Sequence, residues 1–135
     1  MAAMSLAPGI EIVLAYASVL GLVFVGLSAM TILRRRKLSI SLGAGDSEQL
    51  LRLVRAHANF AEYVPIALLL IGGAAILGAP LWLINAGGAI LVAGRLMHAI
   101  AILRADGRLR VVGMTATLSV IGMASLFDLI AVAVA

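Results

Sequence analysis

A long apolar segment, IVLAYASVLGLVFVGLSAMTIL at residues 12–33, runs directly into the basic sequence RRRK at 34–37. Its 22 uncharged residues form a helix about 33 Å long, enough to cross the hydrocarbon core of a bilayer. Pro8 and Glu11 stand in front of it. We therefore expect a transmembrane helix over residues 12–33.

The whole chain of 135 residues has the same character: 64% of its residues are hydrophobic and 12% are charged, and its mean hydropathy is +1.19. Soluble domains carry about 45–50% apolar and about 25% charged residues, so a soluble globule is excluded. The length allows one domain, residues 1–135. The net charge of +4 lies at the ends of apolar segments, which excludes a nucleic-acid surface. The absence of cysteine excludes disulfides, zinc–thiolate sites and a thiol nucleophile.

Three further helices are expected, over residues 48–77, 81–103 and 111–135. The connection before the first of these is polar and contains glycine, and Asp46 or Ser47 is a suitable N-cap. Because all connections are short, the sequence predicts an all-α integral membrane four-helix bundle with up-down topology.

The distribution of lysine and arginine predicts the orientation of the bundle. Residues 34–37 are four consecutive cations and residues 104–110 include three arginines, whereas residues 78–80 include none. Short cytoplasmic loops carry the excess of positive charge. We therefore expect the first and third connections in the cytoplasm and both termini outside it.

Polar side chains gather on one side of the helix expected at 48–77. At about 100° per residue they share an arc of about 100°. These residues are Arg52, Arg55, Asn59, Glu62 and Tyr63. Ionisable groups are costly in lipid, so this polar stripe must face other helices, a neighbouring protomer or a polar cavity. His57 points away from the stripe, and we expect it to be an interfacial residue and not a ligand.

Arg95, on the helix expected at 81–103, lies at a depth similar to that of Glu62. A buried Glu62–Arg95 pair would let each charge offset the desolvation of the other. One interpretation is that this pair only holds the bundle together. The other is an anion site, because the basic groups nearby outnumber Glu62 and arginine suits carboxylate recognition.

Residues 55–65, RAHANFAEYVP, carry a resemblance to a known family. An Arg followed four residues later by Asn, then by Glu-Tyr and Pro, resembles the signature of the MAPEG family, membrane-associated proteins in eicosanoid and glutathione metabolism. The likeness covers nearly the whole chain. Leu96 and Ile100 stand where the leukotriene-synthase branch has tyrosines, so the chain looks more like the bacterial branch. The resemblance implies a homotrimer in a bacterial inner membrane, with glutathione held between subunits near the cytoplasmic side.

The resemblance also implies the residues of the site. Those expected to bind glutathione are Arg35, Arg55, Asn59, Glu62, Tyr63, Arg95 and His98. His98 is either a donor in helix packing or a proton donor in the cavity. Arg110 is the closest match to the arginine that activates the thiol in the leukotriene-synthase branch, and Arg104 and Arg108 compete with it for this role.

This chemistry requires no nucleophile from the protein. The thiolate of glutathione is the reactive species, and a guanidinium beside it in a poorly hydrated cavity favours the anion. The resemblance therefore predicts a glutathione-dependent transferase or peroxidase-like membrane protein that acts on a small lipophilic electrophile. The alternative is a non-catalytic membrane protein whose polar stripe stabilises a trimer. A small exporter is disfavoured because residues 12–33 contain no acid.

Two polar residues near the outer side remain. Asp128 on the last helix and Asn85 on the third have similar depths, and we expect a hydrogen bond between them. The functional alternative is that Asp128 is an ion-coupling carboxylate. The two histidines have no cluster of carboxylates around them in sequence, so no metal site is expected.

Overall fold

The computed structural model describes residues 8–135 and contains four helices. They are α1 (Pro8–Leu38), α2 (Glu48–Ile76), α3 (Leu81–Arg104) and α4 (Gly107–Ala133). The described part of the chain has no strand. All four helices are long and apolar enough to cross a membrane. The prediction of an all-α, four-helix membrane fold is confirmed.

The helix boundaries differ from the predicted ones by up to five residues, and two of these differences have clear local reasons. α1 continues to Leu38, so the basic run at 34–37 is helical, and cations in the last turn suit the negative end of the helix dipole. α4 begins at Gly107, not at residue 111. Asp106 is its N-cap, since one carboxylate oxygen accepts hydrogen bonds from the backbone N–H groups of Arg108 and Leu109, both at 3.0 Å.

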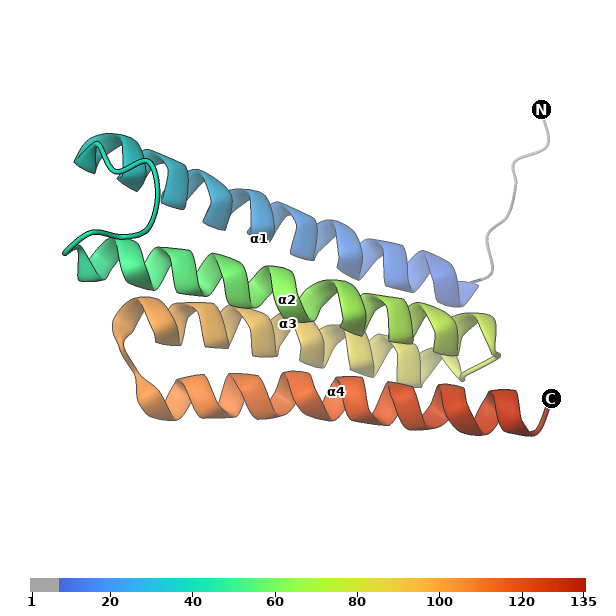
Figure 1. Cartoon of the computed structure of the whole chain (residues 1–135). Helices are drawn as coiled ribbons and strands as arrows, with labels where there is room; N and C mark the ends of the chain where they lie inside the picture. The colour runs from blue at the N-terminus through green and yellow to red at the C-terminus, as the bar shows by residue number, and fades with distance from the viewer. Residues whose placement is uncertain (1–7) are drawn as a thin grey trace, which may run out of the picture.

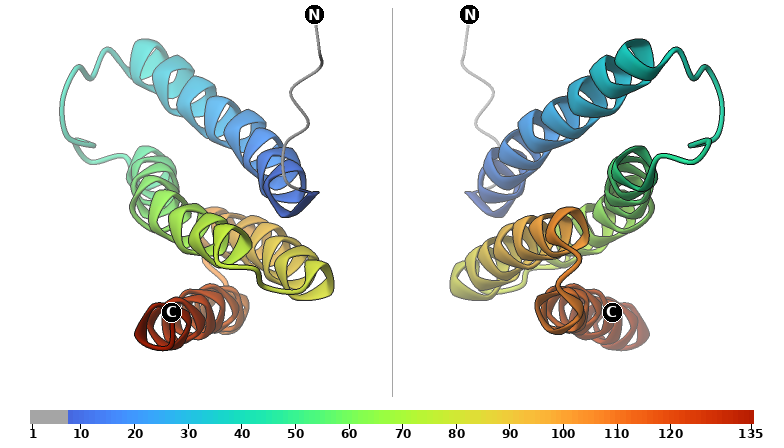
Figure 2. Two further views of the ribbon diagram at one scale, coloured as in Figure 1. Left: turned by 90° about the vertical axis from the view of Figure 1, so that its right-hand side faces the viewer. Right: turned by 90° about the vertical axis from the view of Figure 1, so that its left-hand side faces the viewer.

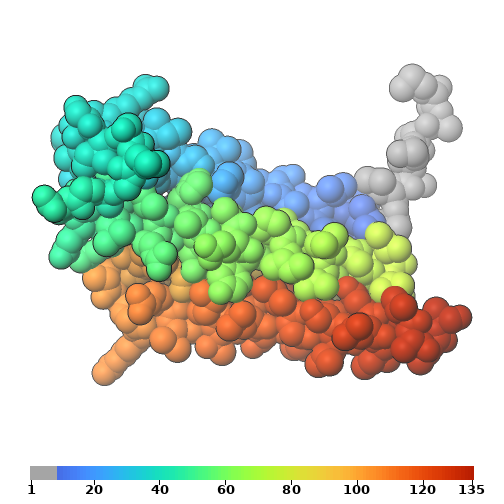
Figure 3. Space-filling view, in the orientation of Figure 1, coloured from blue at the N-terminus to red at the C-terminus, as the bar shows by residue number. Residues whose placement is uncertain are grey.

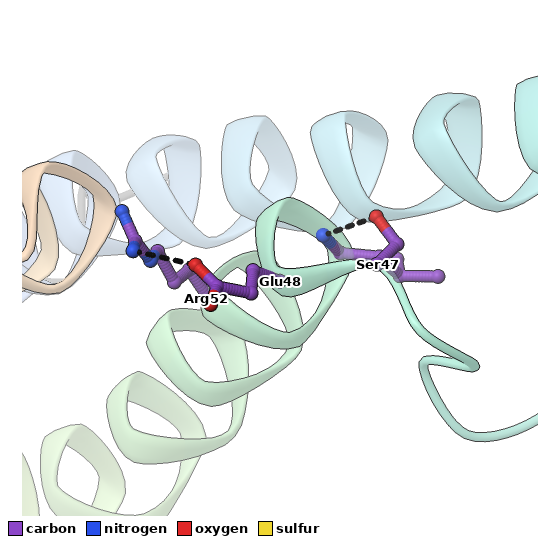
Figure 4. A network of polar contacts seen from close by, with 4 residues as sticks. Ser47, Glu48 and Arg52 are labelled. Atoms are coloured by element: carbon purple, nitrogen blue, oxygen red, sulfur yellow. Dashed lines mark hydrogen bonds and ion pairs between the residues drawn. The ribbon is translucent and has the colours of Figure 1, made fainter.

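Ser47 is the N-cap of α2, the second of the two predicted alternatives. Its hydroxyl oxygen accepts from the backbone N–H of Leu50 at 3.2 Å (Figure 4). An N-cap of this kind contributes about 1 kcal/mol to helix stability. The cap therefore sets the point at which the polar stripe of α2 begins.

The up-down topology places the two charged connections at one end of the molecule, and the start of α1 and the end of α4 at the other (Figure 1). Viewed along the axes, α2 and α3 lie together in the middle, with α1 on one side of them and α4 on the other (Figure 2). Within the described residues, α1 and α4 do not contact each other. α1 also diverges from α2 towards the end that carries the connections (Figures 1 and 2). The bundle is thus three layers deep.

Small residues allow α3 and α4 to approach closely. A Cβ at Gly94 of α3 would lie 3.1 Å from the carbonyl oxygen of Gly113, and one at Gly113 would lie 2.7 Å from the carbonyl oxygen of Gly94. This is the close packing that small residues permit between membrane helices. On one face, α2 and α4 lie side by side along the molecule (Figure 3). The crossing at Gly94 and Gly113 fixes how the neighbouring polar residues of α3 and α4 meet.

Candidate functional site

A polar cavity of about 530 Å³ lies at the end of the bundle that carries the charged connections. Its walls come from the first half of α2, the last turns of α3 and the start of α4. Its polar lining residues are Arg52, Arg55, Asn59, Glu62, His98, Asp106 and Arg110. Four members of the predicted stripe on α2 thus share one cavity, as the helical periodicity predicts.

Arg95 lies beside this cavity and is completely buried, with 0% of its surface exposed. Its Nη2 donates to Asn59 Oδ1 at 2.8 Å, and its Nη1 donates to Thr117 Oγ1 at 3.5 Å. The guanidinium carbon lies 5.5 Å from the ring centroid of Tyr63 and 5.8 Å from that of Phe60, within the range of cation–π attraction. Neutral oxygens and aromatic rings therefore hold this cation.

The predicted pair between Glu62 and Arg95 is wrong for the isolated chain. No carboxylate of the described residues lies within 4.0 Å of Arg95, and the side chain of Glu62 is exposed at the cavity. Asn59, almost one turn earlier on α2, takes the hydrogen bond instead. A hydrogen bond to a neutral amide leaves the positive charge of Arg95 uncompensated.

The charges that line the cavity do not balance. Arg52 pairs with Glu48, one turn earlier on α2, at 3.0 Å (Figure 4). Asp106 is occupied as the cap of α4. Arg55 and Arg110 form no ion pair within the described part of the chain, and Glu62 is the one remaining carboxylate of the lining. Together with Arg95 beside it, the cavity has an excess of positive charge.

His98 connects the two helices at the back of the cavity. Its Nδ1 lies 2.8 Å from the backbone carbonyl oxygen of Arg110, and 3% of its surface is exposed. The two backbones can approach this closely because Gly113 has no side chain. A Cβ at Gly113 would lie only 2.8 Å from the backbone nitrogen of His98. The absence of a side chain at Gly113 thus brings His98 and Arg110 to the same wall.

Comparison with known sequences agrees with this arrangement. The sequence profile of the MAPEG family matches residues 13–129. The chain belongs to the MAPEG family. It is 33% identical over 102 residues to the inner membrane protein YecN of Escherichia coli K12, covering 76% of this chain and 78% of YecN. The YecN protein of Escherichia coli O6:H1 matches to the same extent.

Family membership, four spanning helices and these relatives make this MAPEG chain a multi-pass inner membrane protein. The matched region includes all of α2 and α3 and the whole lining of the cavity. The cavity therefore lies inside the part of the chain that the family shares.

Three arginines are candidates for the position beside the thiol, and the structure distinguishes Arg110 from the other two. Arg110 lines the cavity, whereas Arg104 and Arg108 do not. Arg110 is the fourth residue of α4, because the cap at Asp106 starts the helix early. Arg110 therefore lies about one helical turn beyond the cap, at the wall of the cavity.

The structure does not bring Arg35 to the cavity of its own chain. Its Nη1 donates to the carbonyl oxygen of Gly43 at 2.7 Å and so holds the loop between α1 and α2. α1 is the helix that diverges from α2 at this end (Figure 2). Within one MAPEG protomer, Arg35 thus stabilises a loop, and a glutathione contact from it remains a prediction for an assembly.

The sequence analysis missed Thr117. It is fully buried on α4, donates to the carbonyl oxygen of Gly113 at 2.9 Å and accepts from Arg95. The signal was available, since Gly113 and Thr117 are small residues four positions apart on a membrane helix. The hydrogen bond between Thr117 and Arg95 depends on the crossing of α3 and α4, which the sequence does not specify.

The polar residues near the termini pair differently from the prediction. Tyr16 of α1 donates to Asn85 Oδ1 at 2.5 Å, so Asn85 is not bonded to Asp128. Asp128 lies against Gly73 of α2, where a Cβ would be 2.8 Å from one carboxylate oxygen. The prediction of a hydrogen bond between Asn85 and Asp128 is wrong, because Tyr16 of α1 bonds to Asn85 instead.

His57 faces away from the cavity, as its position on α2 predicts. Its ring stacks on Phe24 of α1 with centroids 4.8 Å apart, and its Nε2 lies 3.0 Å from Ser28 Oγ. It is an interfacial residue between α1 and α2. No three of the histidine, aspartate and glutamate side chains described here are grouped as a metal ion would need.

A second hollow of about 530 Å³ lies at the end of the molecule that carries the termini, between α2, α3 and α4. Its lining is apolar and includes Trp82, Ile90 and Phe127. The two hollows have equal volume but opposite chemistry. Only the one at the charged end brings ionisable groups together.

Proposed function

We propose that this MAPEG protein binds glutathione in the polar cavity and activates its thiol towards a lipophilic electrophile, as a transferase or peroxidase. The observation that supports this is the excess of arginine at the cavity. Arg55, Arg110 and the buried Arg95 face one free carboxylate, Glu62. Glutathione carries two carboxylates and one ammonium group, so it supplies the missing negative charge and a partner for Glu62.

The place of Arg110 also supports a ligand of negative charge. A cation at the start of a helix lies at the positive end of the helix dipole, which is unfavourable for helix stability. An anion bound there interacts favourably with both the guanidinium and the helix terminus. In this proposal Arg55 and Arg95 attract the carboxylates of glutathione, Glu62 accepts from its amine, and Arg110 lies nearest the sulfur.

The assembly proposed for this function is a homotrimer with the cavity closed by a neighbouring subunit. Arg55 and Glu62 are exposed in the single chain, although they lie on a helix that crosses the membrane. Charged groups in such helices face protein or water, not lipid. Native mass spectrometry in mild detergent is expected to show trimers, and a population of monomers or dimers alone would contradict the proposal.

Thermal unfolding of the purified protein in detergent tests the proposed ligand. Glutathione that binds only the folded state raises the midpoint of unfolding. We expect this rise in the wild type and in Arg36→Gln, whose arginine is exposed and lies outside the polar cavity. In Arg55→Gln the apparent affinity is expected to fall by about tenfold, equivalent to about 1.4 kcal/mol. No rise in the wild type would reject glutathione binding and favour the non-catalytic alternative.

A further inference from the structure

One nitrogen of the His98 ring is committed by its hydrogen bond to the backbone. Nδ1 lies 2.8 Å from the carbonyl oxygen of Arg110. A carbonyl oxygen accepts and never donates, so the hydrogen of this bond is on Nδ1. The neutral ring carries a single N–H. Its other nitrogen, Nε2, is then an acceptor with a free lone pair.

The free nitrogen belongs to a side chain that lines the polar cavity. No hydrogen bond to Nε2 is formed within the described part of the chain, although the residue is almost fully buried. The tautomer that presents a base to the cavity is therefore set by the backbone of α4. Arg110 supplies both the carbonyl group that sets it and the guanidinium proposed to lie beside the sulfur.

The charged groups around His98 come from every wall of the cavity. α3 contributes Arg95, α2 contributes Arg52, Arg55 and Glu62, and the start of α4 contributes Asp106 and Arg110. Cations are in excess, so an imidazolium formed here needs an anion beside it. A thiolate formed in the same cavity is such an anion.

We propose that Nε2 of His98 accepts the thiol proton of bound glutathione. This inference rests on the proposed function. The S–H bond breaks, its electron pair stays on sulfur, and the proton moves to Nε2, so that a thiolate forms beside an imidazolium. The guanidinium of Arg110 stabilises the sulfur anion. After the sulfur attacks an electrophile, the imidazolium returns the proton to the anion that develops on the product or leaving group.

Two substitutions separate this role from a purely structural one. In His98→Asn, the side-chain amide nitrogen takes the position of Nδ1, so donation to the carbonyl oxygen of Arg110 is kept while Nε2 is removed. His57→Asn is the matched control, since it makes the same change at a histidine that contacts α1 and lies outside the cavity. If His98 only positions Arg110, His98→Asn behaves as the wild type.

The test measures where the thiol proton goes when glutathione binds. Calorimetric titrations at pH 7 in two buffers of different ionisation enthalpy give the number of protons released, and ultraviolet absorbance gives the thiolate formed. We expect thiolate in the wild type and in His57→Asn, with close to zero protons released per thiolate, because the protein retains the proton. In His98→Asn we expect the absorbance to fall by more than half, with about one proton released per thiolate that still forms.

S-methylglutathione, which has no thiol proton, is expected to bind the wild type and His98→Asn with affinities within about threefold of each other. Release of about one proton per thiolate by the wild type would overturn the inference and leave the proposed function intact. Proton retention by His98→Asn equal to that of the wild type would do the same. A wild-type protein that does not bind glutathione, or binds it without thiolate, would reject thiol activation and this inference together.

Discussion

Arg95 is the largest side chain that the structure buries completely. Its neighbours are the oxygens of Asn59 and Thr117 and the rings of Phe60 and Tyr63, and its Nε has no partner among the described residues. A buried cation without a carboxylate costs several kcal/mol of desolvation. Ionisable groups inside membranes at such a cost mark functional sites by default. We therefore propose that Arg95 contributes charge to the cavity and not stability to the fold.

Arg95→Met tests this assignment. A flexible apolar side chain of similar length fills the space without desolvating a charge, so we expect the free energy of unfolding to stay the same or rise by about 1–4 kcal/mol. Glutathione affinity is expected to fall at least about tenfold. Denaturant titration and glutathione titration of the same preparation measure both quantities. A loss of stability above about 2 kcal/mol, with glutathione binding kept, would show that Arg95 is a structural tie.

Arg110→Ala tests the position of the thiol. In the proposed function the other arginines attract the carboxylates, so we expect glutathione affinity to stay within about threefold. The pKa of the bound thiol is expected to rise by one unit or more, since the nearest cation is lost. Titration of the thiolate absorbance with pH measures this, with Arg108→Ala as the control outside the cavity. An unchanged pKa in Arg110→Ala with a raised pKa in the control would exchange their roles.

At the scale of the element, the crossing of α3 and α4 determines the site. Gly94 and Gly113 bring the two backbones together, and within four residues of them lie Arg95, His98 and Thr117. The hydrogen bonds from His98 to Arg110 and from Arg95 to Thr117 both span this crossing. A small change in the separation of α3 and α4 therefore alters the positions of the side chains at the cavity.

Gly113→Ala is expected to destabilise the protein by about 1–3 kcal/mol through overpacking. The new Cβ would lie 2.7 Å from the carbonyl oxygen of Gly94 and 2.8 Å from the backbone nitrogen of His98, both rigid backbone atoms. Gly122→Ala on the same helix is the matched control, because its Cβ would meet nothing within 4 Å. There the higher helix propensity of alanine is expected to be neutral or to stabilise by up to about 1 kcal/mol. Equal unfolding midpoints for the two variants would contradict the close crossing.

At the scale of the whole molecule, charge is distributed unequally between the two ends. The basic residues of 34–37 and 104–110 lie at one end, together with the polar cavity, and the start of α1 and the end of α4 lie at the other (Figure 1). Because short basic loops stay in the cytoplasm, we propose that the cavity opens on the cytoplasmic side. A cytosolic thiol such as glutathione then reaches it without crossing the bilayer.

Reporter fusions test this orientation. A reporter inserted after Lys37 is expected to be on the cytoplasmic side, and one fused to the C-terminus on the opposite side. Activity of a cytoplasmic reporter such as green fluorescent protein, compared with that of a periplasmic phosphatase at the same sites, distinguishes the two. Both sites on one side would contradict the three spans that separate them, α2, α3 and α4, and exchanged sides would place the cavity outside the cytoplasm.

Sequence alone was sufficient to predict the four spans and the side of α2 on which the stripe lies. These features depend on hydropathy and on the helical period, which are properties of neighbouring residues. For the same reason His57 was placed away from the cavity, and Ser47 was one of two caps named for α2. The motif at residues 55–65 was sufficient to indicate the family, since it combines four polar residues at fixed helical spacing.

Only the tertiary structure decided which polar groups meet. Asn59 and Glu62 lie less than one turn apart on the same side of α2, so helical period does not tell which of them bonds to Arg95. Nor does it separate Arg110 from the arginines nearby, because the cap at Asp106 and the crossing at Gly113 set where α4 starts and how it rotates. Contacts between helices depend on crossing distance and rotation, and these follow from packing over the whole bundle.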